Sequence, residues 1–118
     1  MRKAVVTGAG GFIGSHLVEA LLQQGDAVVG IDSMGPPHAA GKEANLRAAQ
    51  EARDFRLVRL DITTARDSDL LAALDGADLL FHLAGQPGVR DSWGPAFVQY
   101  TRRNVEATQK LLELSRQL

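Results

Sequence analysis

The sequence predicts an α/β fold built on a parallel β-sheet with helices on both faces. Short apolar runs typical of buried strands alternate along the chain with segments of helical periodicity. The connections between the early elements are short, as they are in compact α/β units. With 118 residues, 45% of them hydrophobic, the chain can bury the core of one domain.

The first half predicts two strands and two helices. A β-branched run over residues 4–7 and an apolar run over residues 27–31 predict buried strands, joined by a helix that Gly25 ends. Residues 33–41 contain two glycines and two prolines and predict an exposed loop. Residues 42–53 predict a short, mostly solvated helix.

The second half continues the alternation. Residues 55–60 predict a third strand, residues 68–74 a helix, and residues 78–84 a fourth strand too apolar to lie half in water. Apolar residues at helical spacing predict a long amphipathic helix from about Pro95 onward, namely Val98, Val105 and Leu112, with Leu111, Leu114 and Leu118. Right-handed crossovers would order the four strands 3-2-1-4, as in part of a doubly wound sheet.

Composition and charge argue against several classes of function. A formal net charge of -1 and an isoelectric point near 6.3 give no electrostatic basis for binding nucleic acid or an anionic membrane. The absence of cysteine excludes disulfides and thiol catalysis, and it favours the cytoplasm. His16, His38 and His82 lie on different predicted elements, so we expect no metal site.

The strongest functional signal is the glycine-rich stretch Thr7–Gly14, between a predicted strand and a predicted helix. Glycines there allow positive φ and a close approach of a pyrophosphate, and the helix N-terminus offers free N–H groups to the anion. A glycine-rich turn by itself can also be a tight connection without a ligand. The flanking strand and helix favour a Rossmann-type dinucleotide site.

Asp32 stands at the end of the second predicted strand, where an acid that binds the adenosine ribose is expected. Its carboxylate would accept hydrogen bonds from both ribose hydroxyls and would repel a 2′-phosphate, which predicts NAD rather than NADP. Ser33 follows, not an arginine that would favour the phosphorylated cofactor. The alternative is a surface carboxylate that ends a strand.

A second glycine-containing segment does not predict a nucleoside triphosphatase. Five residues separate Gly35 from Gly41-Lys42, and Glu43 stands where a phosphate-binding loop needs Ser or Thr.

The glycines Gly8, Gly11 and Gly14 follow a G-x-x-G-x-x-G spacing, and Thr-Gly-x-x-Gly-Phe-Ile-Gly resembles the opening of the extended short-chain dehydrogenase/reductases. That family contains the NAD-dependent nucleotide-sugar epimerases and dehydratases. Further segments resembling it, which extend the similarity over the whole chain, are Asp61-Ile62, His82–Gly85, Gln86–Ser92 and Tyr100-x-x-x-Asn104-Val105.

The resemblance assigns roles to particular residues. It implies that Asp61 and Ile62 contact the adenine, and that the segment after the fourth strand lies along the nicotinamide. The residues expected to bind the cofactor are Gly8, Gly10, Gly11, Phe12, Ile13, Gly14, Asp32, Asp61, Ile62, Leu83, Ala84 and Gly85. Arg90 is a candidate for binding a nucleotide-sugar phosphate, or else a solvated loop arginine. Asn104 either holds backbone near the active site through its amide, or is a capping or solvent-facing asparagine.

The sequence predicts no catalytic residue. The family's base is a tyrosine followed four residues later by a lysine, whereas Tyr100 is followed by Asn104. We therefore interpret residues 1–118 as an NAD-binding domain truncated before that motif and before the substrate lobe, and inactive alone. The alternatives are a non-catalytic NAD-sensing module and another short-chain dehydrogenase/reductase.

Two surfaces predict self-association. The apolar fourth strand would form an unpaired sheet edge in the absence of a fifth strand, and such edges recruit partners. The last helix is the other candidate, because the resembled family uses it at its dimer interface.

Overall fold

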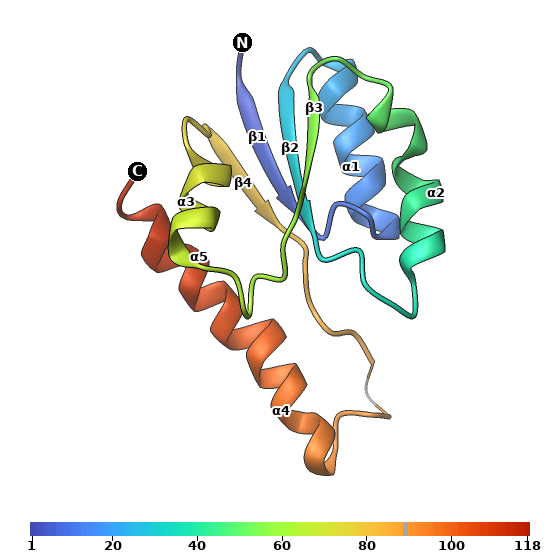
Figure 1. Cartoon of the computed structure of the whole chain (residues 1–118), viewed down its shortest axis with the longest axis vertical. Coiled ribbons are helices and arrows are strands. Elements are labelled where there is room, and N and C mark those ends of the chain that lie inside the picture. The colour runs from blue at the N-terminus through green and yellow to red at the C-terminus, as the bar shows by residue number, and fades with distance from the viewer. Residues whose placement is uncertain (89) are drawn as a thin grey trace.

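The computed structural model describes residues 1–88 and 90–118. Within them, four parallel strands form one sheet in the order β3-β2-β1-β4, which confirms the predicted order (Figure 1). The strands are β1 (Lys3–Thr7), β2 (Ala27–Asp32), β3 (Phe55–Arg59) and β4 (Leu79–His82). β1 lies between two neighbours, and its Ala4, Val5 and Val6 are fully buried.

Helices cover both faces of this sheet (Figure 1). α1 (Phe12–Gln23) and α2 (Ala39–Gln50) lie on one face, and α3 (Asp67–Leu74) and α5 (Ala107–Ser115) lie on the other. Alternate strand residues feed two separate cores, because successive side chains point to opposite faces. Val6 packs with Val18 of α1, whereas Val5 packs with Leu111 of α5.

α2 begins at Ala39, three residues before the predicted start, and ends at Gln50. Ala39 and Ala40 extend the helix toward the N-terminus, and Gly41 lies inside the helix rather than in the loop. Leu46 and Ala49 are its buried residues, so most of the helix surface faces solvent. The loop before α2 is correspondingly shorter than predicted.

β4 is less buried than its sequence predicts. All four of its residues are only partly buried, and the strand ends at His82 rather than Ala84. The described part of the chain pairs β4 with β1 alone, so its second edge has no neighbouring strand. The expectation of a fully covered strand was therefore wrong.

The last helical segment runs through η1 (Gly94–Ala96), α4 (Phe97–Tyr100), the π-helical η2 (Thr101–Glu106) and α5. Figure 1 shows α4 projecting beyond the end of the sheet. Of the described residues in these four segments, the buried ones belong to α5, which packs against the sheet through Ala107, Leu111 and Leu114.

The predicted apolar residues of this helix are buried only in part, because Leu111 and Leu114 pack against the sheet and the others do not. Val98, Val105 and Leu112 are all exposed, as is Trp93 before the helix. The part of the helix before α5 extends past the sheet, and the wider turn of η2 changes the helical phase. Among the described residues, no helix combines the length and apolarity needed to cross a bilayer.

Candidate functional site

The predicted site residues gather at the carboxyl ends of the strands. Gly8 follows the end of β1, Asp32 ends β2 and Leu83 follows the end of β4, and these three strands are parallel. In open α/β sheets, ligands bind in the crevice at the carboxyl ends of the strands.

The glycine turn brings three segments close together. Gly8 has a φ of 67°, and its N–H donates to the Ile31 carbonyl at 2.8 Å. A Cβ added to Gly8 would lie 2.8 Å from the backbone nitrogen of Ala84, and one added to Gly14 would lie 2.0 Å from the Gly8 carbonyl oxygen. Side chains at these positions would push the turn away from α1 and from the segment after β4.

The first turn of α1 is open to solvent. Phe12 and Ile13 are 75% and 70% exposed, large values for apolar side chains. In residues 1–88 and 90–118, no side chain caps this helix, and its first turn contains no acid. The N–H groups there are free of carboxylate competition and suit the oxygens of an anionic ligand.

Asp32 is held firmly beside this turn, with 3% of its side chain exposed. Its Oδ2 accepts a hydrogen bond from the Gly10 N–H at 2.9 Å, and its Oδ1 accepts one from the Met34 N–H at 2.8 Å. Oδ1 also lies 2.8 Å from Nζ of Lys42. The acid and the glycine turn therefore form one hydrogen-bonded group, called the Asp32 unit, which consists of Gly10, Asp32 and Met34.

Asp61 and Ile62 lie just beyond the end of β3. Asp61 is exposed, and its Oδ1 accepts hydrogen bonds from the backbone N–H and the hydroxyl of Thr63, at 2.9 and 2.6 Å. Ile62 is buried, and Lys110 of α5 donates to its carbonyl at 3.0 Å. The turn that carries both residues is thus fixed to the sheet and to α5.

His82 joins β1, β4 and α5 through hydrogen bonds. Its Nδ1 lies 2.7 Å from Thr7 Oγ1, and its Nε2 lies 3.1 Å from Thr108 Oγ1. Thr7 Oγ1 accepts from the N–H groups of Leu83 and Ala84, at 3.0 and 3.1 Å. These donors occupy both of its lone pairs, so the Thr7 hydroxyl donates to Nδ1 and the imidazole proton resides on Nε2. Burial lowers the pKa of His82 and so favours this neutral form.

The segment after β4 is held by the last helix. Asn104 Oδ1 accepts from the Gln86 N–H at 2.7 Å, and Asn104 Nδ2 donates to the Gln86 carbonyl at 3.1 Å. The Tyr100 hydroxyl donates to the Pro87 carbonyl at 3.4 Å. The Asn104 amide thus holds the Gln86 backbone while the residue itself is exposed.

The rest of this loop is partly described. Val89 lies outside the described residues. Arg90 is exposed in a turn and is 58 residues after Asp32 in the sequence. Leu83 is exposed and Gly85 lies against Asn104, whose Oδ1 would be 2.9 Å from a Cβ at that glycine.

Two groups of residues in the site were missed from the sequence. Lys42 and Asn45 of α2 reach the Asp32 unit, where Asn45 Nδ2 donates to the Gly10 carbonyl at 2.9 Å. Thr7 and Thr108 form the bonds to His82. No sequence feature pointed to Lys42, which begins the segment interpreted as a short, mostly solvated helix.

These features fit a dinucleotide. Glycines allow close approach of a pyrophosphate, the open first turn of α1 offers N–H donors, and a buried acid stands at the next strand end. Among the described residues, no cluster of three or more His, Cys, Asp or Glu side chains could hold a metal ion. The fold and the site together define the class of Rossmann-type dinucleotide-binding domains.

Comparison with known proteins names the family. The sequence pattern of the NAD dependent epimerase/dehydratase family matches residues 4–118, and the chain belongs to this family. The "Uncharacterized UDP-glucose epimerase YtcB" of Bacillus subtilis (strain 168) is 44% identical over 98% of the chain and 36% of the relative. The UDP-glucose 4-epimerase of Mycolicibacterium smegmatis is 39% identical over 97% of the chain and 34% of the relative.

A solved structure supports the same relationship. UDP-glucuronic acid 4-epimerase from Bacillus cereus, in complex with UDP-glucuronic acid and NAD, matches with a TM-score of 0.88 and 43% identity. The match covers 98% of this chain and 37% of that one. The chain therefore spans about a third of the length of these relatives.

Proposed function

We propose that this chain binds NAD as the nucleotide-binding, N-terminal part of an epimerase or dehydratase that acts on a UDP-sugar in the cytoplasm. The observation that carries the proposal is the hydrogen bond between Gly10 and Asp32, which joins the glycine turn to the ribose acid in one rigid unit. The family's name supports NAD, and the UDP-sugar names of the relatives support the substrate class.

The proposed contacts extend from this unit in two directions. Gly8, Gly10, Gly11, Phe12, Ile13 and Gly14 would face the pyrophosphate, and Asp61 and Ile62 would contact the adenine. Leu83, Ala84 and Gly85 would lie along the nicotinamide. Arg90 and Asn104 would serve the substrate side, Arg90 by pairing with a phosphate and Asn104 by holding the Gln86 backbone. Bound NAD would supply the hydride acceptor of the reaction.

Calorimetric titration of the folded chain with NAD tests the binding proposal. Asp32→Ala removes the ribose acid, so we expect NAD affinity to fall about tenfold or more, and NADP affinity to fall less. Asp54→Ala is the matched control, since Asp54 is an exposed acid outside this site. A folded wild-type chain that does not bind NAD would contradict the proposal, and equal losses for both cofactors would remove the ribose role of Asp32.

We propose that residues 1–118 alone do not turn over a nucleotide sugar. Tyr100 is followed four residues later by Asn104, so these 118 residues contain no Tyr-x-x-x-Lys. Proton removal and hydride transfer must occur together in this chemistry, and the base is therefore required. Conversion of UDP-glucose or UDP-glucuronic acid by the isolated chain, followed by NMR, would contradict this part of the proposal.

We also propose self-association, through the free edge of β4 or through the last helix. Val98, Val105 and Leu112 expose apolar surface on that helix, and β4 has no second partner strand among the described residues. Sedimentation velocity at rising concentration tests it. Val105→Lys should weaken association if the helix is responsible, whereas Gln109→Lys on the same helix should not. A monomer at all concentrations would contradict both routes.

A further inference from the structure

Lys42 is fixed against the ribose acid by its own helix. Its Nζ lies 2.8 Å from Asp32 Oδ1, and 23% of the lysine side chain is exposed. Asn45, one turn further along α2, donates to the Gly10 carbonyl at 2.9 Å and holds the helix against the glycine turn. Lys42 is thus held against the Asp32 unit.

The contacts of Asp32 leave little room for a ribose. A carboxylate offers about four lone-pair positions, two on each oxygen. Oδ1 already accepts from Met34 and Lys42, and Oδ2 accepts from Gly10. One position remains, on Oδ2. A ribose diol can donate one hydrogen bond there, and its second hydroxyl oxygen can accept from the ammonium of Lys42.

The lysine also changes the charge of the site. An unpaired carboxylate repels a 2′-phosphate, whereas a carboxylate paired with an ammonium carries no net charge toward it. We propose that Lys42 is a specificity-determining residue that lets the ribose site accept a 2′-phosphate. The dissociation constants for NAD and NADP should therefore differ little. This inference rests on the proposed function.

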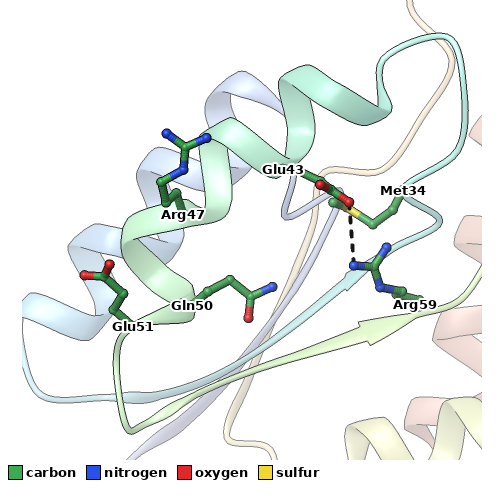
Figure 2. Close-up of a pocket in the computed structure, with 6 residues that line it drawn as sticks. All are labelled: Met34, Glu43, Arg47, Gln50, Glu51 and Arg59. Carbon is green, nitrogen blue, oxygen red and sulfur yellow. Dashed lines mark ion pairs between the residues drawn. The ribbon is translucent and has the colours of Figure 1, made fainter.

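The neighbouring charges do not replace Lys42. A hollow of about 390 Å³ lies beside α2 and the end of β3, lined by Met34, Glu43, Arg47, Gln50, Glu51 and Arg59. Figure 2 shows Glu43 pointing toward Arg59, with which it forms an ion pair at 3.8 Å, while Arg47 points away from that pair. The two arginines are matched by two glutamates, so this hollow has no excess positive charge.

Titration of the chain with NAD and with NADP tests the role of Lys42. Lys42→Gln keeps a hydrogen-bond donor for the buried carboxylate but removes the charge, and Lys42→Arg keeps the charge. Lys3→Gln is the matched control. Lys3 lies at the start of β1, so it is at the amino ends of the strands, whereas Asp32 is at their carboxyl ends. Circular dichroism of each variant establishes that it is folded.

We expect Lys42→Gln to raise the ratio of the NADP to the NAD dissociation constant about tenfold or more. Lys42→Arg and Lys3→Gln should leave that ratio unchanged. An unchanged ratio in Lys42→Gln, or an equal loss of both cofactors, would overturn the inference while leaving the proposed function intact. A wild-type chain that binds neither cofactor would contradict the proposed function and this inference with it.

Discussion

Both polar atoms of the Asn104 amide bind the backbone of Gln86, which lies 18 residues earlier in the chain. One residue of η2 thereby satisfies the donor and the acceptor of a single peptide position in the segment after β4. Gly85, beside it, has no side chain to obstruct the contact. The last helix therefore shapes the loop that follows the strand, although it projects past the sheet.

Replacing Asn104 should loosen this segment locally. Asn104→Leu has a similar size but cannot bond Gln86, so we expect the Gln86 amide to exchange its hydrogen about tenfold faster. Hydrogen exchange followed by NMR measures it. Gln109→Leu, on the same helix but at a side chain that donates to Glu113 rather than to Gln86, is the control. Unchanged exchange at Gln86 in the Asn104 variant would show that the loop does not depend on this amide.

Removing the Thr7 hydroxyl should destabilise the whole fold. Thr7→Val keeps the shape of the side chain, but it leaves the Ala84 N–H and His82 Nδ1 without their shared oxygen, while the Leu83 N–H keeps its bond to the Thr7 carbonyl at 3.3 Å. An unsatisfied buried group costs about 1–3 kcal/mol, so the free energy of unfolding should fall by about that much. Urea denaturation measures the change. Thr7→Ser, which keeps the hydroxyl, should lose clearly less. A Thr7→Val variant as stable as the wild-type chain would contradict a stabilising role for the hydroxyl.

The stability of the chain should depend on pH through His82. Burial holds the pKa of His82 in the folded chain below its ordinary value of 6.5. Below pH 6.5 the unfolded chain gains the proton first, so the free energy of unfolding falls as the pH drops toward the lowered pKa and levels off beneath it.

Urea denaturation from about pH 8 to about pH 5 measures that dependence. His82→Gln should remove part of the loss of stability, whereas His16→Gln, at an exposed position on α1, should keep it. A wild-type chain with equal stability above and below pH 6.5 would contradict a depressed pKa for His82.

The strand order could be predicted because it depends on local patterns and on chain chirality. Apolar runs such as Ala27–Ile31 are short and bounded by turn residues, and right-handed crossovers leave few ways to connect them. The partial burial of β4 agrees with the unpaired edge expected in the absence of a fifth strand, and the apolar composition of the strand alone overestimated its burial. The buried face of the last helix was predicted in part, because Leu111 and Leu114 pack against the sheet whereas Val98, Val105 and Leu112 are exposed.

The candidate site was predictable where spacing along the chain encodes it. Gly8 to Gly14 and Asp32 have fixed sequence relationships to the strands that carry them. Lys42 does not, because it reaches Asp32 only when α2 folds back across the glycine turn. On a polar helix, a lysine that contacts a buried acid and a lysine that faces solvent look the same in the sequence.

Gly14 of α1 and Gly41 of α2 should respond in opposite ways to alanine. A Cβ at Gly14 would lie 2.0 Å from the Gly8 carbonyl oxygen, and neither backbone segment can move without opening the turn. We therefore expect Gly14→Ala to lower the free energy of unfolding by about 3 kcal/mol or more, or to prevent folding. A Cβ at Gly41 would meet nothing within 4 Å, so Gly41→Ala should raise it by about 0.5 kcal/mol.

Thermal denaturation of both variants beside the wild-type chain measures this contrast. The helical preference of alanine over glycine is the same at both positions, so the difference between the variants isolates the contact between Gly14 and the Gly8 carbonyl. A Gly14→Ala variant as stable as Gly41→Ala would mean that the turn can shift to admit a methyl group. The turn would then not be the rigid platform for a pyrophosphate on which the proposed cofactor site depends.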